Sequence, residues 1–128
     1  VLKKLGSKNV MVFSGHDGLD EISTTSKTTI SQMIDGNEIK DFTLDPNDLS
    51  IPYAKMGDLS GGSPDENAKI IKSILDGERG PRRDIAAINA AAGIFVGNGK
   101  ITIQEAYDYA NESIDSGMAL KVLKKLQT

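Results

Sequence analysis

The pattern of apolar and polar positions predicts strands in the first half of the chain. Residues 9–13 form a short and nearly continuous apolar run, which is typical of a strand buried on both faces in a parallel sheet. Residues 24–34 alternate in part, residues 35–37 (Asp-Gly-Asn) favour a turn, and residues 38–44 return as a further strand. We therefore expect one buried strand followed by an antiparallel hairpin, with the acidic residues between 35 and 48 on a solvated sheet edge.

The second half of the chain shows the period of amphipathic helices instead. Capping boxes at Ser63–Glu66 and Thr102–Glu105 place two helix starts, because serine or threonine and a glutamate three residues later bond to each other's backbone. Proline at the first helical position and glycine past the last one supply further boundaries. The expected helices run from 64 to about 76, from 81 to about 96, from 103 to about 114 and from about 118 to 126.

Apolar side chains at helical spacing indicate which faces of these helices are buried. The second helix carries small side chains on nearly every side, so we expect it to be central and closely packed. The apolar stripe of the first helix consists of Ala68, Ile71, Ile74 and Leu75, and the third helix carries Ala106, Tyr109, Ala110 and Ile114.

Composition narrows the class of protein. The chain of 128 residues, 13.7 kDa, suits one domain over residues 1–128. Its 15 basic and 18 acidic side chains sum to −3, so no chain-wide positive charge attracts nucleic acid. The absence of cysteine excludes disulfides, thiol nucleophiles and cysteine-ligated metals, and the single histidine, His16, excludes multi-histidine sites within the chain. No apolar run approaches the ~20 residues of a membrane span and no signal segment opens the sequence, so we expect a cytoplasmic protein.

The first six residues have the pattern of a helix end. Leu5 closes an apolar stripe, the preceding lysines suit a helix C-terminus, and Gly6 suits the left-handed cap position. A native chain seldom starts with the end of an element, and a self-standing doubly wound sheet needs more parallel strands than this sequence supplies. We therefore expect a missing N-terminal portion.

The densest polar segment is the loop of residues 14–23, Ser-Gly-His-Asp-Gly-Leu-Asp-Glu-Ile-Ser. It follows the predicted buried strand, and ligands of open α/β sheets bind beyond the carboxyl ends of strands. The adjacent carboxylates of Asp20 and Glu21 are able to hold Mg2+, directly or through its waters, while substrate phosphates complete the octahedron. An acidic pair also arises by chance, as at residues 65–66, so the significance of this pair comes from its position in the loop.

Three further features have both a functional and a structural interpretation. His16 suits a general base as a residue type, because imidazole exchanges protons near neutral pH, but a loop histidine bonded to backbone is the more common role. Gly61-Gly62 before a helix resembles a phosphate cradle, yet the acids at 65–66 occupy the positive helix end and favour a tight structural turn. Asn89, inside the alanine-rich helix, is expected to be buried and to find hydrogen-bond partners, which is more often a structural role.

The arginines form a local basic cluster. Arg79, Arg82 and Arg83 lie at the expected start of the second helix and together suit an anion. The favoured alternative is a surface patch in which they pair with Glu78 and Asp84.

Three segments in the same order resemble the anthranilate phosphoribosyltransferase family. The strongest is the Asp-Gly-Leu-Asp-Glu-Ile-Ser loop, within residues 14–23. Residues 61–68 resemble the family's Gly-Gly-x-x-x-Glu-Asn-Ala segment, and residues 75–84, followed by 89–92, resemble its next block. The resemblance implies the C-terminal portion of a nucleoside phosphorylase/phosphoribosyltransferase-type α/β domain, with a buried strand, an antiparallel hairpin and about four helices.

The resemblance also implies a function. Members of this family transfer phosphoribosyl from phosphoribosyl pyrophosphate (PRPP) to anthranilate with Mg2+, a step of tryptophan biosynthesis, and are usually homodimers. Asp20 and Glu21 match the positions that contribute to the family's Mg2+ site beside the pyrophosphate. The family's Gly-Thr-Gly-Gly-Asp loop, its Lys-His-Gly-Asn segment and its anthranilate-binding arginine have no counterpart in this sequence. We therefore assign no catalytic residue here and expect the chain to be inactive by itself.

Two other functions stay open at this point. A non-catalytic relative with the same fold could bind nucleic acid, which the net charge of −3 and the acidic hairpin disfavour. A decayed remnant could instead act as a structural or dimerisation piece. The related pyrimidine nucleoside phosphorylases share the general architecture but match the Asp-Gly-Leu-Asp-Glu loop less well.

Overall fold

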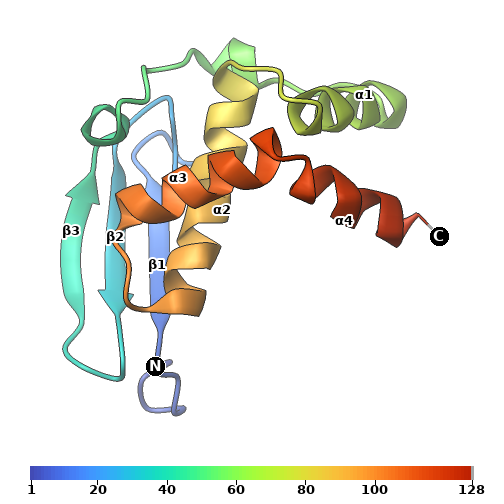
Figure 1. The fold of residues 1–128 in the computed structure, drawn as a ribbon. Helices are drawn as coiled ribbons and strands as arrows, with labels where there is room; N and C mark the ends of the chain where they lie inside the picture. The colour runs from blue at the N-terminus through green and yellow to red at the C-terminus, as the bar shows by residue number, and fades with distance from the viewer. Residues whose placement is uncertain (128) are drawn as a thin grey trace.

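The computed structural model describes residues 1–127, which form a three-stranded antiparallel sheet with helices on one face (Figure 1). The sheet order is β1-β2-β3, and each neighbouring pair is antiparallel. This arrangement confirms the expected α/β fold of strand, hairpin and four helices within the described residues. The elements are β1 (Val10–Gly15), β2 (Thr28–Met33), β3 (Lys40–Leu44), the 3-10 helices η1 (Pro46–Leu49) and η2 (Met56–Leu59), α1 (Pro64–Leu75), α2 (Pro81–Asn98), α3 (Ile103–Asp115) and α4 (Met118–Leu126).

The turn between β2 and β3 lies where the Asp-Gly-Asn sequence predicts it. Asp35 and Gly36 have positive φ angles of 54° and 70°, and the Asn37 N–H donates to the Ile34 carbonyl at 3.0 Å. Two consecutive positive φ angles give a type I′ turn, whose twist matches that of the flanking strands. The hairpin places β3, with its charged residues Lys40 and Asp41, on an outer edge of the sheet, where charge discourages pairing with another chain.

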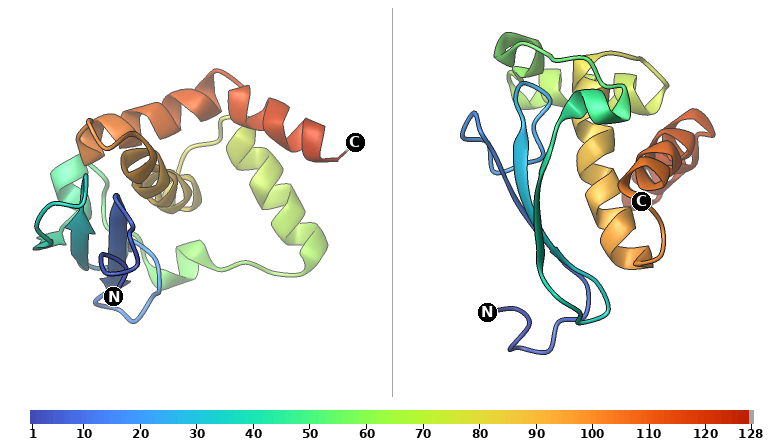
Figure 2. Two further views of the ribbon diagram at one scale, coloured as in Figure 1. Left: turned by 90° about the horizontal axis from the view of Figure 1, so that it is seen from below. Right: turned by 90° about the vertical axis from the view of Figure 1, so that its left-hand side faces the viewer.

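Helix α2 is the centre of the core, as its small residues predict. It lies between the sheet and α3 (Figures 1 and 2). On its sheet side, Ile88 and Ala92 join a cluster with Ile30 of β2 and the loop residue Ile22. On its other side, Ala91 packs in a second cluster with Phe95 and with Ala106 of α3. Alanines at the crossing let the two helix backbones approach closely.

Both predicted capping boxes are present. The Ser63 hydroxyl accepts from the Glu66 N–H, and the Glu66 carboxylate accepts from the Ser63 N–H at 2.7 Å. Thr102 and Glu105 make the same reciprocal pair at the start of α3. Of the two glycines expected to stop α2, Gly97 and Gly99, the second does so: the helix ends at Asn98, and Gly99, with a φ of 70°, is the left-handed cap. None of the helices in residues 1–127 combines the length and apolar character that crossing a membrane requires.

The apolar stripe of α1 is not buried within the described residues. No residue of α1 is buried, and Ile71 is 51% exposed. Figure 2 shows α1 and α4 beyond α2, away from the sheet. Tyr109 of α3 is also exposed, and the neighbouring Tyr107 packs against the core instead. A sequence period shows which face of a helix is apolar, whereas burial depends on another element lying against that face.

The expectation that the first strand is buried on both faces was also wrong for the described residues. Met11 and Phe13 pack against the core, but Val12, on the opposite face, is 55% exposed. Strand β1 pairs only with the antiparallel β2, and its other edge has no strand partner within residues 1–127. The outer face beside β1 contains an apolar hollow of about 290 Å³, lined by Val1, Leu2, Lys3, Val10, Val12, Ser31, Gln32, Met33 and Ile39.

Residues 1–7 form a single helical turn. The Ser7 N–H donates to the Leu2 carbonyl at 3.2 Å and the Gly6 N–H to the Lys3 carbonyl at 3.1 Å. Gly6 has a φ of 90°, so this is a Schellman-type ending with glycine at the left-handed position. The predicted cap role of Gly6 is confirmed.

Candidate active-site loop

The loop that follows β1 is shaped by a close approach of its backbone at Gly15. The Gly15 N–H donates to the Leu19 carbonyl at 2.9 Å, and the Gly18 N–H donates back to the Gly15 carbonyl at 3.1 Å. A Cβ at Gly15 would lie 2.5 Å from the Asp17 carboxylate and 3.3 Å from the Leu19 carbonyl. Glycine is therefore favoured at this position, because a side chain would displace the Asp17 carboxylate from its hydrogen bonds.

The Asp17 carboxylate connects the two sides of this loop. It accepts hydrogen bonds from the Leu19 N–H at 3.1 Å and from the hydroxyls of Ser23 and Thr25. Desolvation raises the pKa of Asp17, but these hydrogen bonds, together with one involving Ser26, outweigh it and lower the pKa from 3.8 to about 2. Asp17 is ionised at neutral pH and serves as a hydrogen-bond acceptor that holds the loop closed.

Asp20 and Glu21 lie between these tied residues and point into solvent. Both residues are exposed, and within residues 1–127 neither carboxylate has a hydrogen-bond or ion-pair partner. No cluster of three or more histidine, aspartate or glutamate side chains in the described chain forms a complete metal site. Two free carboxylates nevertheless suit Mg2+, which is usually held by one or two carboxylates plus water and substrate phosphates. The donor set fits one part of a magnesium site.

His16 is separate from the acidic pair. Its ring Nε2 lies 2.9 Å from the Thr29 hydroxyl of β2, and its backbone N–H donates to the Lys27 carbonyl at 2.8 Å. The histidine therefore bonds to a side chain, whereas a backbone partner was the favoured expectation. Because the ring is exposed and paired across the loop, its position indicates a role in tying the loop to β2.

Gly61-Gly62 forms the structural turn that the sequence favours. The Gly62 N–H donates to the Asn67 side-chain oxygen at 2.8 Å, and the Asn67 amide donates to the Gly62 carbonyl at 3.1 Å. The side chain of Asn67 thus occupies the Gly62 N–H, which is the donor that a phosphate cradle would offer to its ligand. This pairing leaves the glycine pair as a helix-entry turn.

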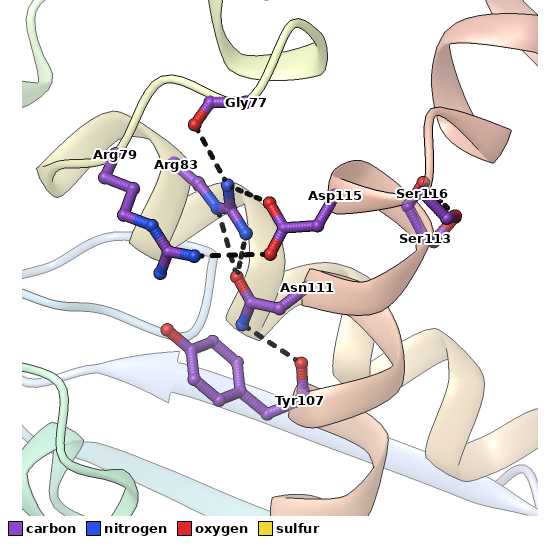
Figure 3. A network of polar contacts seen from close by, with 8 residues as sticks. All are labelled: Gly77, Arg79, Arg83, Tyr107, Asn111, Ser113, Asp115 and Ser116. Atoms are coloured by element: carbon purple, nitrogen blue, oxygen red, sulfur yellow. Dashed lines mark hydrogen bonds and ion pairs between the residues drawn. The ribbon is translucent and has the colours of Figure 1, made fainter.

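The interpretation of the arginine cluster as a surface patch paired with Glu78 and Asp84 was wrong for Arg83. Figure 3 shows Arg83 reaching from α2 to α3, and it is only 2% exposed. Its guanidinium bonds to the Asp115 carboxylate at 2.7 Å and to the Asn111 side-chain oxygen at 2.9 Å and 3.1 Å. The exposed Arg79 shares Asp115 at 3.4 Å. These contacts fasten α2 to α3.

Burial and charge around this network shift the pKa values of its carboxyl groups in opposite directions. The hydrogen bond from Arg83 lowers the pKa of Asp115, and desolvation opposes this shift only in part. Desolvation raises the pKa of Asp84, which Arg83 and Arg79 offset only in part. The third arginine, Arg82, donates to the Ser60 carbonyl at 2.7 Å. The arginine cluster therefore has mainly a structural role.

The structure adds loop residues that sequence reasoning did not select. Asp17, Ser23 and Thr25 form the network that closes the loop, and the run of serine and threonine at 23–26 was the available signal. Asn89 was noticed as the polar residue of an alanine-rich helix, but its partner could not be deduced. It bonds to the backbone of Ile22, which lies 67 residues earlier in the chain.

Residues 1–120 match the model of the glycosyl transferase family, α/β domain. The chain belongs to this family. An anthranilate phosphoribosyltransferase of Methanococcoides burtonii is 50% identical over 126 residues, which cover 98% of this chain and 35% of that protein. This similarity confirms the resemblance found in the sequence.

Solved structures of anthranilate phosphoribosyltransferases share the fold of this chain. The anthranilate phosphoribosyltransferase of Thermus thermophilus gives a TM-score of 0.84 at 28% identity, covering 97% of this chain and 36% of that one. The Saccharomyces cerevisiae enzyme in complex with PRPP and Mg gives 0.79 at 30% identity, covering 91% and 33%. The chain spans about a third of the length of these relatives. The C-terminal placement within the family stays a prediction.

Proposed function

We propose that this chain is the part of an anthranilate phosphoribosyltransferase that carries its magnesium carboxylates. The observation that carries the proposal is the closed loop after β1, which holds Asp20 and Glu21 exposed and without partners within the described residues. The yeast relative has been solved in complex with PRPP and Mg. On this proposal the parent enzyme acts in tryptophan biosynthesis in the cytoplasm, as a homodimer.

The proposed reaction breaks the bond between ribose C1 and the pyrophosphate oxygen of PRPP and forms a bond from C1 to the anthranilate nitrogen. Magnesium, when bound, supplies charge neutralisation for the departing pyrophosphate and orients it. The chain's own contribution is to hold Asp20 and Glu21 exposed and free of other partners within the described residues. Asp17 supports them by keeping the loop closed through Leu19 and Ser23.

A second part of the proposal is that the chain is inactive by itself. Two carboxylates are a partial magnesium site, and the family's phosphate loop and anthranilate-binding arginine are absent from this sequence. The two edges of the sheet differ in a way that supports the same conclusion. The β3 edge carries the charged residues Lys40 and Asp41, which protect it against pairing, whereas the β1 edge, Val-Met-Val-Phe-Ser-Gly, carries no charged residue. We propose that the missing portion of the fold covers β1 and the hollow around Val12.

The test is a chimera in which this chain replaces the matching third of the Methanococcoides burtonii relative. Transfer is followed by the loss of anthranilate fluorescence with PRPP and Mg2+. The chimera should be active, and Asp20→Ala with Glu21→Ala should lower its kcat/KM by at least about 100-fold. Asp65→Ala, which alters the chain's other acidic pair, is the matched control and should leave the rate unchanged.

Each part of the proposal has its own contrary result. Full activity of the chimera after both loop substitutions would overturn the magnesium role of Asp20 and Glu21. Turnover by the isolated 128-residue chain would overturn its proposed dependence on the missing portion.

A further inference from the structure

The loop that presents the acidic pair is tied to α2 by one side chain. Asn89 of α2 accepts from the Ile22 N–H at 2.9 Å and donates to the Ile22 carbonyl at 2.9 Å. A carboxamide has one acceptor and one donor side, so it pairs with both backbone groups of a single residue as a neighbouring strand would. A third bond, from the amide to the Ile85 carbonyl at 2.9 Å, holds Asn89 against its own helix.

The residue that Asn89 holds is the one immediately after Glu21. Ile22 is 1% exposed and packs in the core cluster that includes Ile88 and Ala92 of α2. Its side chain and both of its backbone groups are therefore fixed against the same helix. The backbone that follows Glu21 is thus fixed relative to α2, which is the most central element of the fold.

The other end of the pair is fixed in the same manner. The Leu19 N–H donates to Asp17 at 3.1 Å, and the Leu19 carbonyl accepts from the Gly15 N–H at 2.9 Å. Asp20 and Glu21 are therefore a two-residue span between two residues whose N–H and C=O groups are all bonded. None of these bonds uses the carboxylate of Asp20 or of Glu21. The loop is therefore held in place while both of these acids stay free for a ligand.

We propose that Asn89 is a positioning residue for Asp20 and Glu21, which sets the direction of both carboxylates toward a divalent cation by clamping the backbone of Ile22 to α2. The inference rests on the proposed function, since it assumes that the acidic pair holds the cation. Groups that orient metal ligands govern affinity because they remove the cost of ordering the ligands when the metal binds.

Asparagine suits this position for reasons of size and hydrogen bonding. Asn89→Asp keeps the shape of the side chain but removes the two donors, which leaves the Ile22 and Ile85 carbonyls facing a carboxylate. Asn89→Ala leaves both backbone groups of Ile22 unpaired in a partly buried site. Both variants are expected to loosen the loop next to Glu21 while α2 itself persists.

The test titrates the 128-residue chain with Mn2+, which is followed by electron paramagnetic resonance as a probe for the cation. Asn89→Ala is expected to raise the Mn2+ dissociation constant about 10-fold. Asn111→Ala is the matched control, because Asn111 is also a half-buried asparagine on a helix but bonds to Arg83 and Tyr107. It should lose stability to a comparable degree and keep the Mn2+ constant within 2-fold. Amide hydrogen exchange at Glu21 and Ile22 should accelerate in the Asn89 variants alone.

Contrary results separate the two proposals. If Asp20→Ala weakens Mn2+ binding but Asn89→Ala does not, or if Asn111→Ala weakens it equally, the positioning role is overturned and the magnesium role of the pair stands. If Asp20→Ala and Glu21→Ala leave Mn2+ binding unchanged, the proposed function fails, and the inference fails with it.

Discussion

The pKa of the Asp17 carboxyl is lowered, because the hydrogen bonds that it accepts outweigh its desolvation. Its hydroxyl partners, Ser23 and Thr25, come from the far side of the loop, so the low pKa reports loop closure. Since the folded-state pKa of about 2 lies below the ordinary value of 3.8, the stabilisation is complete above pH 3.8 and is lost as the pH falls through 2.

We predict that the Asp17 carboxyl carbon titrates near pH 2 in the folded chain, as measured by carbon NMR. Ser23→Ala removes one of the hydrogen bonds that favour the ionised form and should move the midpoint up toward 3.8. Ser116→Ala, at the C-terminal end of α3, should leave it unchanged. A midpoint at or above 3.8 in the unaltered chain would show that the loop is open in solution.

Two arginines of very different burial share Asp115 of α3: Arg83, which lies in α2, and Arg79, which precedes it. The Arg83 side chain is 2% exposed, whereas the Arg79 side chain is 78% exposed. Solvent screens the exposed pair, while the buried guanidinium depends on its partners for all its hydrogen bonds. The same acid therefore takes part in one strong and one weak interaction.

We predict that Arg83→Ala lowers the free energy of unfolding by about 2–3 kcal/mol in urea titrations. Arg79→Ala, which removes the exposed partner of the same acid, should have a much smaller effect. Because Arg83 lowers the pKa of Asp115, the stability gained from the pair is fully present above the ordinary aspartate pKa and is lost as the pH falls through the lowered pKa of the folded chain. The difference between Arg83→Ala and the unaltered chain should therefore narrow in acid. Equal effects of the two arginine variants would contradict this account.

At the scale of the whole molecule, the sheet has one protected edge and one unprotected edge. The proposed covering of β1 predicts that Val12→Lys blocks assembly with the missing portion of the fold. The isolated chain should keep its stability within about 0.5 kcal/mol, because Val12 is exposed there. Activity regained on mixing with the missing portion, made as a separate polypeptide, is the measurement, and we expect a loss of at least about 10-fold.

The matched control is Thr43→Lys, on the exposed β3 edge, which should leave this complementation intact. Efficient complementation by Val12→Lys would mean that the missing portion lies elsewhere on the molecule.

Local patterns in the sequence determined the turn at Asp35-Gly36, the capping boxes and the helix limits, because these depend on residues that are close along the chain. The acidic pair was found in the same way, from its place in a glycine-containing loop that resembles a family segment.

Only the tertiary structure decided which apolar faces are covered and which polar groups meet. Arg83 pairs with Asp115 rather than with Glu78, and Val12 is exposed. Asn89 bonds to Ile22, which lies 67 residues earlier in the chain. These outcomes depend on contacts between elements far apart in the sequence. Periodicity and spacing describe one element at a time, and so they do not contain that information.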